Sequence, residues 1–393
     1  MDSQAGITVE HDNTVPIHMQ LLTQLRQLIL SGQWPPGSRI PSETQLQRDL
    51  HISRSTVRQA YSKAEAEGLI KRVPGKGTYV NWLPHQEAAG QHIGYIANVL
   101  SSDFEYRILI GAEHAAKSRG FHILFSNVND PHEEPQLIDQ LLKGHVAGLL
   151  IFPTLMEQPS RHLFELEQQR LVPFVCVDRT LPGLTSDFVT SDNFAGAVAA
   201  VEYLISLGHR RIAFLSHPIL QLSTVAERLR GYRQALQDAR LTPLEPWLVG
   251  VAEKEIQYRA TLRVNHEGEV AKEEILQVVD FLQRPQRPTA LFAMNDAMAL
   301  LALKAARLLH LGVPDDLSVV GFDDREIASH LDVPLTTVAQ DGFALGRRAA
   351  ELLIDRISGY DGPQRQVVVP TQLKVRATAG PPSPHAVDSS GLM

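Results

Sequence analysis

Hydrophobic residues along the chain follow two different periods, and the change between them divides the sequence. From Pro16 to about Val80, apolar residues recur every three to four positions, as in amphipathic helices, and then give way to a short hairpin pattern. From Ile93 to about Arg376, short apolar runs alternate with amphipathic segments, which is the pattern of a parallel α/β sheet. The sequence therefore predicts an α/β protein of two unlike parts.

The domain boundaries follow from the same pattern. A polar segment with Pro and Gly separates the two parts, and the end of the chain has almost nothing apolar to bury. We expect a disordered N-terminus (1–14), a small domain of helices and a hairpin (15–81), a linker (82–91), a larger α/β domain (92–380) and a disordered tail (381–393).

The first part has the order of a winged helix-turn-helix. Pro16 opens a helix whose apolar stripe ends at Gly32, and the hydroxyls of Ser42 and Ser53 cap two further helices. A glycine-rich hairpin follows over residues 69–80. Two short helices joined by a tight turn are typical of DNA readers, in which the second helix enters the major groove.

Arginines and hydroxyls gather at the start of the third helix. Arg54 and Arg58 are four positions apart and share one helix face, so they suit the O6 and N7 acceptors of guanine. Such a pair alone is usually a solvated surface, but with capping hydroxyls and a basic hairpin tip it favours DNA contact. The residues that we expect to contact DNA are Arg39, Ser42, Ser53, Arg54, Ser55, Thr56, Arg58, Gly75, Lys76 and Gly77.

These features carry a resemblance to a known family. The segment that begins at Val15 and includes "ILSGQWPPGSRIPSETQLQRDLHISRSTVRQAYSKAEAEGLIKRVPGKGTYV" resembles the GntR family of bacterial regulators over about 65 residues. The resemblance implies a dimer on palindromic double-stranded DNA, with Arg54 and Arg58 reading bases. It also implies that Ser53, Ser55 and Thr56 hold phosphates and that Gly75 to Gly77 form the wing tip. Thr44 stands where relatives often have an arginine, so one contact is weakened or lost.

Charge and cysteine content narrow the function further. The chain has 393 residues and a net charge of −7, yet the segment between Gly37 and Lys76 contains eight basic and only four acidic residues. An acidic chain with one basic segment indicates that only this segment meets nucleic acid. The single cysteine, Cys176, excludes an intrachain disulfide and a cysteine-based zinc site, and we expect no metal or cofactor. With no apparent signal peptide or membrane span, we expect a cytoplasmic protein without a membrane partner.

The larger part offers a ligand site at the ends of its predicted strands. In open α/β sheets, ligands bind beyond the carboxyl ends of the strands, so polar residues that follow each apolar run are candidates. Carboxylates accept sugar hydroxyls, a guanidinium such as that of Arg228 donates in a fork, and an aromatic ring covers C–H groups. The predicted strands are 93–99, 122–126, 148–152, 174–178, 212–216, 290–294 and 319–322.

A second resemblance covers residues Ile93 to Arg376. The segments "LISLGHRRIAFLS", "ERLRGYRQAL", "RPTALFAMNDAMALLALKAAR", "VPDDLSVVGFDD" and "PLTTVAQDGFALGRRAAELLIDRI" resemble the LacI-type sensor domain, which is related to periplasmic sugar-binding proteins. The resemblance implies two Rossmann-like lobes, three crossovers and an effector in the cleft. It also implies that Phe104, Asp178, Arg228 and Asp296 contact the effector and that Asp323 lies beside them at a crossover. Residues 252–270 match this pattern poorly.

The combination of both parts resembles the arabinose-responsive repressors. We therefore expect a homodimeric repressor, with a pentose such as L-arabinose as the first candidate effector. Effector binding is expected to close the cleft and to move the recognition helices out of register with the DNA. A nucleoside or another non-sugar ligand, or an activator in place of a repressor, remain alternatives.

Other classes of protein find less support in the sequence. We find no HExxH, GxSxG or phosphate-binding loop and no lysine in a convincing cofactor context, which disfavours a fused enzyme such as an aminotransferase. A transport protein requires export, which the N-terminus does not indicate. Cys176 lies in an apolar run and is more typical of a core residue than of a redox sensor.

Overall fold

The computed structural model describes residues 7–10, 15–81, 92–98, 103–128, 130–154, 157–169, 171–250 and 272–383. The chain forms two compact units, residues 1–90 and 91–393. We call them the DNA-binding unit and the sensor unit. The expected linker, the poorly matching segment and most of the expected tail lie outside the described residues.

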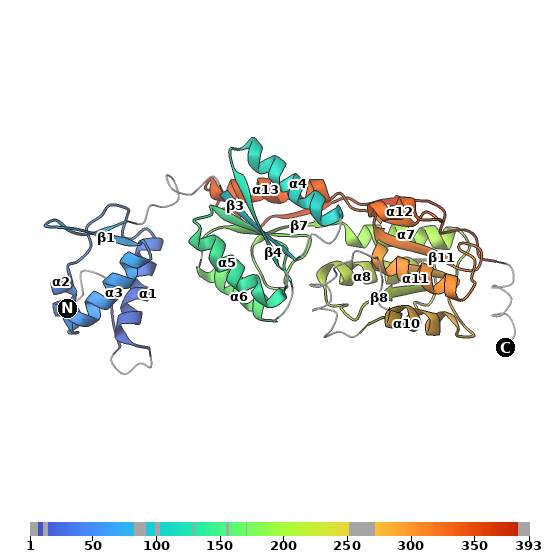
Figure 1. Cartoon of the computed structure of the whole chain (residues 1–393), viewed down its shortest axis with the longest axis horizontal. Helices are drawn as coiled ribbons and strands as arrows, with labels where there is room; N and C mark the ends of the chain where they lie inside the picture. The colour runs from blue at the N-terminus through green and yellow to red at the C-terminus, as the bar shows by residue number, and fades with distance from the viewer. Residues whose placement is uncertain are drawn as a thin grey trace. The chain divides into compact units, whose positions relative to one another are not determined.

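The DNA-binding unit has the predicted three helices and hairpin (Figure 1). Ser42 accepts the N–H of Gln45, and Ser53 accepts the N–H of Thr56, so both hydroxyls cap the helices that follow them. The elements are α1 (Ile17–Leu30), α2 (Glu43–Leu50), α3 (Arg54–Ala66), β1 (Ile70–Val73) and β2 (Gly77–Val80), and β1 pairs antiparallel with β2.

The N-terminal residues differ from the expectation. Ile7 is only 1% exposed and belongs to the same apolar core as α1 and α3. The N–H groups of Thr8 and Glu10 donate to the side chains of Gln24 and Gln20, respectively. Disorder over 1–14 is therefore wrong for residues 7–10, because Ile7 fills the core and its neighbours bond to α1.

The sensor unit contains two lobes, each built on a six-stranded sheet. In the first lobe the strand order is β13-β7-β6-β5-β3-β4 and all pairs are parallel. Apolar residues alternate between two cores, with α4 and α13 on one face and α5 and α6 on the other. The strands are β3 (His92–Asn98), β4 (His122–Val128), β5 (Gly148–Ile151), β6 (Phe174–Val177), β7 (Asp187–Ser191) and β13 (Gln366–Val369). The helices are α4 (Asp103–Ser118), η1 (Pro131–Glu133), α5 (Glu134–Lys143), α6 (Glu157–Gln169) and α13 (Gly342–Ile357).

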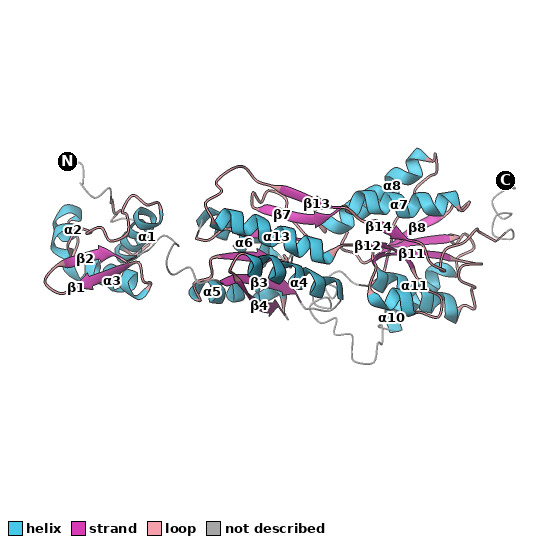
Figure 2. Ribbon diagram, turned by 90° about the horizontal axis from the view of Figure 1, so that it is seen from above, coloured by secondary structure: helices cyan, strands magenta, loops and turns pink. Residues whose placement is uncertain are grey.

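The second lobe repeats this plan with the order β14-β12-β11-β10-β8-β9, in which only the β12–β14 pair is antiparallel. Helices α7 and α8 lie on one face of the sheet, and α10 and α11 lie on the other (Figure 2). The strands are β8 (Ile212–Ser216), β9 (Trp247–Leu248), β10 (Ala290–Ala293), β11 (Ser318–Asp323), β12 (Thr336–Ala339) and β14 (Gln372–Lys374). The helices are α7 (Asn193–Ser206), α8 (Ser223–Asp238), α10 (Lys272–Leu282), α11 (Asp296–Leu308) and α12 (Glu326–His330).

The chain passes between the lobes three times: from β7 to α7, from β12 to α13, and from β13 to β14. This confirms the predicted two-lobed architecture. Asp323 ends β11 and pairs with Ala339, the last residue of β12, so it lies beside the crossover that starts at Gln340, as expected. All seven predicted strands are present, whereas β7, β9, β12, β13 and β14 were not predicted.

Two glycines bring α4 and α13 into backbone contact. A Cβ built on Gly346 would lie 1.8 Å from the carbonyl oxygen of Ile108, and one on Gly111 would lie 2.0 Å from that of Phe343. No side chain fits at either position, so the two helices pack at the closest distance that backbones allow. Among the described residues, no helix is both long and apolar enough to cross a membrane.

Candidate functional site

The DNA-binding unit presents the predicted contact residues on one part of its surface. Arg54 and Arg58 emerge from the first turns of α3, and each side chain is 60% exposed. The hydroxyls of Ser55 and Thr56 lie within 2.7 Å of the capping hydroxyl of Ser53. The turn that starts α3 therefore offers two guanidinium groups and three hydroxyls to a ligand.

The hairpin residues lie together as well. Arg39 forms an isolated bridge with Tyr79, and a Cβ on Gly77 would lie 2.8 Å from the Nε of Arg39. Gly75 and Gly77 adopt φ angles of +74° and +118°, which a residue with a side chain seldom adopts. The tip that carries Lys76 thus depends on both glycines, and Arg39 lies against its base.

Glu43 at the start of α2 organises the arginines of this surface. Its carboxylate lies 3.6 Å from the Nε of Arg54, 3.5 Å from that of Arg58 and 3.2 Å from the Nη2 of Arg72. Arg72 also pairs with Glu65 at 3.3 Å. Sequence reasoning missed Glu43 because it considered only donors to DNA and not the acceptors that hold them.

In the sensor unit, the centre of the candidate effector site is Arg228, on α8. The residue is 5% exposed, and its guanidinium carbon lies 3.7 Å from the centre of the Phe322 ring. Its Nε donates to the Oδ1 of Asn193 at 2.8 Å, and its Nη1 donates to the carbonyl of Met294 and lies 3.6 Å from Asp323. No described residue accepts a hydrogen bond from Nη2, so this group remains available to a ligand.

Asp323 ends β11 next to this arginine. Its Oδ1 accepts a hydrogen bond of 2.8 Å from the side chain of Gln340, which follows β12. Burial raises the pKa of Asp323 to about 6, although the charge of Arg228 opposes this shift. Asp323 has a φ of +119° and Asp178 a φ of +65°. Such backbone angles are costly for residues with side chains and cluster at functional sites.

Asp178 and Arg179 face the cluster from the first lobe. Asp178 is 5% exposed, and one of its oxygens lies 3.6 Å from the Nε of Arg179. The guanidinium of Arg179 lies 4.5 Å from the centre of the Phe152 ring. The charge of Asp178 acts on Arg228, so charged groups from the two lobes influence each other at this site. The structure thus brings together Asp178, Arg228 and Asp323, as predicted.

Asp296, a predicted effector contact, begins α11 and bonds to two groups of the protein itself. It is fully buried, and its carboxylate accepts the hydroxyl of Thr337 and, at 2.8 Å, the N–H of Arg325. Burial, followed by the nearby charge of Asp323, raises the pKa of Asp296 to about 8. With both oxygens occupied by protein groups, Asp296 supports the segment after β11 in this conformation.

Phe104, another predicted effector contact, lies in the same apolar core as Phe152. The residue is 9% exposed and belongs to the core between the first sheet, α4 and α13. A Cβ on Gly342 would lie 2.7 Å from the carbonyl oxygen of Phe104 and 3.3 Å from its ring. Phe104 therefore packs against the start of α13, and Phe322 and Phe152 are the rings that lie against the site's arginines.

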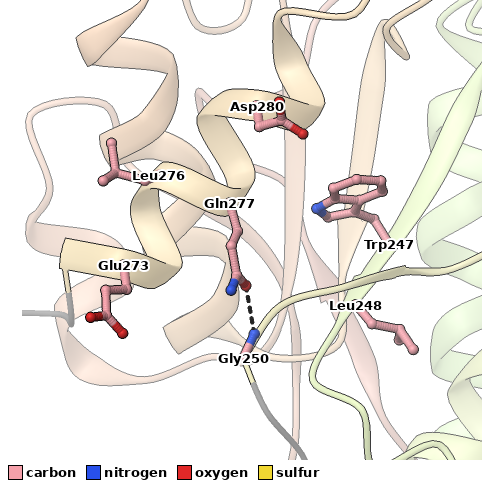
Figure 3. Close-up of a pocket in the computed structure, with 7 residues that line it drawn as sticks. All are labelled: Trp247, Leu248, Gly250, Glu273, Leu276, Gln277 and Asp280. Carbon is pink, nitrogen blue, oxygen red and sulfur yellow. Dashed lines mark hydrogen bonds between the residues drawn. The ribbon is translucent and has the colours of Figure 1, made fainter.

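A separate hollow of about 500 Å³ lies at the edge of the second sheet (Figure 3). Trp247 and Leu248 of β9 form one side, and the exposed side of α10, with Leu276 and Gln277, forms the other. Gln277 accepts the N–H of Gly250 at 2.8 Å across this hollow. Its walls contain no residue of the Arg228 cluster, so the hollow is distinct from the candidate effector site.

Comparison with known proteins agrees with both units. Residues 19–80 match the family of bacterial regulatory proteins named gntR, and residues 201–379 match the periplasmic binding protein-like domain. The arabinose metabolism transcriptional repressor of Geobacillus stearothermophilus is 33% identical over 353 residues, which cover 88% of this chain and 92% of the relative. The ribose operon repressor of Escherichia coli K12 is 28% identical over 337 residues, or 84% and 96% of the two chains.

A solved structure supports the same assignment. The transcriptional regulator CelR in complex with cellobiose has a TM-score of 0.63 at 27% identity, and the match covers 84% of this chain and 92% of that one. The chain belongs to the family of GntR-type transcriptional repressors with a periplasmic-binding-protein-like domain.

Within this repressor family fold, two polar residues of the cluster were not predicted. Asn193 begins α7 and holds Arg228, and Gln340 follows β12 and holds Asp323. Both come directly after strands that the apolar pattern did not reveal, β7 and β12. Asn193 and Gln340 therefore do not follow any predicted strand, and the rule that identified the other polar residues could not identify these two.

Proposed function

We propose that this repressor binds its operator as a homodimer and releases it when a small, uncharged sugar binds around Arg228. The observation that carries the proposal is the placement of Arg228, which is buried, fixed from three sides, next to Asp323 and close enough to Asp178 of the first lobe to feel its charge. L-Arabinose is the first candidate, because a relative that matches over most of its length is an arabinose metabolism repressor.

The charges of the cluster support an uncharged ligand. Arg228 lies beside Asp323 and feels the charge of Asp178, and Arg179 lies beside Asp178. Each guanidinium already has a carboxylate neighbour, so a phosphate or sugar acid would have to compete with these carboxylates and would be repelled by them. Carboxylates instead accept the hydroxyls of a neutral sugar, while Nη2 of Arg228 donates to its oxygens.

The DNA-binding surface supports operator recognition. In the proposal, Arg54 and Arg58 read base edges in the major groove. Ser53, Ser55 and Thr56 bond phosphates, together with Arg39 and Ser42. The tip formed by Gly75, Lys76 and Gly77 contacts the adjacent groove or backbone. The protein acts by binding rather than by catalysis, in the cytoplasm, where its operator lies.

Exposed apolar side chains on α4 and α13 support the homodimer. Tyr106 is 53% exposed, Ile110 39% and Phe343 38%, and the ring of His114 lies 5.6 Å from that of Phe343. Burying such a strip against a second copy removes apolar surface from water. We expect I110D to shift the chain from dimer to monomer in light scattering.

A thermal-shift screen tests the effector first. Purified protein is heated with pentoses, hexoses, sugar phosphates and nucleosides. A ligand present at a hundred times its dissociation constant stabilises the native state by about 2.7 kcal/mol. A binding sugar must then lower operator affinity at fixed salt, as measured by fluorescence anisotropy. Stabilisation only by a nucleoside or a phosphorylated sugar would contradict the neutral-sugar site, and unchanged operator affinity would contradict effector control.

A further inference from the structure

Asn193 lies at the border between the lobes. It is the first residue of α7, directly after the crossover from β7, and it is 3% exposed. The crossover residue Asp192 caps the same helix by accepting the N–H of Ala195. A buried amide that loses a hydrogen-bond partner is costly, so each of its hydrogen bonds matters for where the chain crosses.

The two ends of the Asn193 amide bond different parts of the molecule. Its Oδ1 accepts from the Nε of Arg228 at 2.8 Å, and its Nδ2 donates to the carbonyl of Ser191 at 3.0 Å. The orientation of the amide is fixed by chemistry, because a guanidinium N–H can only donate and a carbonyl can only accept. One side chain thus joins the candidate effector arginine to the last residue of a first-lobe strand.

The crossover itself is bonded to a second one. The N–H of Asp192 donates to the carbonyl of Val369 at 2.8 Å, and the hydroxyl of Thr371 donates to the carbonyl of Asp192 at 3.2 Å. A Cβ on Gly196 would lie 2.6 Å from the Oγ1 of Thr371, so α7 packs tightly against this second crossover. A shift of Asn193 therefore reaches two of the three connections between the lobes.

We infer that Asn193 is a positioning residue with two separable effects. Its Oδ1 directs Arg228 toward the effector, and its Nδ2 transmits the position of Arg228 to the crossover strands, and so to operator release. The inference rests on the proposed function, in which Arg228 contacts the effector.

The two effects are tested by substitutions that separate them. N193D keeps an acceptor for Arg228 but replaces the donor that faces Ser191 by an oxygen. We expect N193D to bind the sugar within about threefold of wild type, because a hydrogen bond to a charged group is kept. We expect it to lose sugar-driven release, so that operator affinity with and without sugar becomes equal. N193A removes the bonds to Arg228 and Ser191, and also the 3.4 Å bond from Nδ2 to the hydroxyl of Thr190, and should weaken sugar binding by about 10- to 100-fold.

Calorimetry with L-arabinose, or with the sugar found in the screen, measures binding to the full chain, and anisotropy measures operator release. E202Q, on the exposed side of α7, is the matched control and should match wild type in both. Wild-type affinity in N193A would overturn the inference while the proposed function stands. A pure packing role predicts wild-type behaviour for N193D, which has the same shape. If N193A does not fold, N193S replaces it. A wild-type chain that binds no sugar contradicts the proposed function and removes the inference with it.

Discussion

In the DNA-binding unit, Arg54 and Arg58 each keep 60% of their side-chain surface exposed and share the carboxylate of Glu43. In the sensor unit, the Arg228 side chain is 6% exposed and is held by an amide, a carbonyl, an aromatic ring and a carboxylate. Exposed ion pairs contribute little to stability, whereas a buried charge that loses its partners is costly. Arginine therefore serves two purposes in this protein. The exposed arginines can exchange a weak ion pair within the protein for a contact with DNA. The buried arginine keeps a fixed geometry for a small ligand.

The largest expected effect comes from the buried arginine. R228Q leaves Asp323 without its cation and removes the donor that faces the ligand. We expect the free energy of unfolding to fall by about 3–5 kcal/mol, as for other broken buried pairs. Sugar binding should be lost while operator binding persists.

Denaturant titration and calorimetry measure both effects. R230Q is the control on the same helix, because Arg230 is 64% exposed and pairs with Glu227 near the surface. Equal losses of stability in R228Q and R230Q would show that burial does not decide how much an arginine of α8 contributes to stability.

A pH dependence should follow from the buried carboxyls. Burial raises the pKa of Asp296 to about 8 and that of Asp323 to about 6, above the value of about 3.9 in an unfolded chain. The folded chain then binds more protons than the unfolded chain, so the free energy of unfolding falls as the pH rises from about 4 to 8. The slope is at most about 1.4 kcal/mol per pH unit for each carboxyl.

Calorimetry on the full chain between pH 6 and 8 monitors the thermal unfolding of the sensor unit and so measures this slope. D296N removes the titrating group but can still accept from Arg325 and donate to Thr337, so its slope should be smaller. Stability that rises over this range would mean that Asp296 is ionised in the folded chain.

At the DNA surface the effects should be smaller and should appear in recognition rather than in folding. R54A should weaken operator binding by about 1–3 kcal/mol and relax selectivity at one base pair. Binding to operator variants, changed one base pair at a time, measures this at constant salt. An equal loss on specific and random DNA would instead make Arg54 a phosphate contact. R26A, in an exposed pair with Glu67, is the control.

The smallest effect is expected for Glu43. E43Q removes the carboxylate that orients three arginines and also removes a negative charge from the DNA-binding surface. We expect the ratio of specific to non-specific affinity to fall by about 1 kcal/mol, while binding to random DNA becomes stronger. Competition anisotropy against random DNA measures the ratio. An unchanged ratio would mean that the arginines reach their bases without Glu43.

The two units also differed in how far the sequence predicted them. The contact surface of the DNA-binding unit lies within residues 39–77, so caps, helix faces and hairpin glycines could all be found by local rules. The main miss was Ile7, because a single apolar residue in a polar segment has no period to reveal its burial.

The sensor site is built from residues far apart in the chain, and prediction was accordingly partial. Asp178, Arg228 and Asp323 were found because two lie at the ends of apolar runs and one lies in a family motif. Asn193 and Gln340 were missed because the Thr, Ser and Asp residues of β7 and β12 hide the apolar pattern. The sequence could not show that Thr337 and Arg325 bond the carboxyl of Asp296, and its contact with the effector stays a prediction.

The glycine contact between α4 and α13 has a consequence for how the chain is made. The first lobe begins at β3, but its sheet is completed by β13 and its outer layer by α13, which the ribosome adds more than two hundred residues later. Until then, the side of α4 that carries Gly111 and the edge of β7 lack the partners that cover them in the folded chain. The first lobe therefore cannot complete its fold until nearly the whole second lobe has been synthesised. Chains that stop before Gly342 would expose this apolar surface to chaperones and proteases.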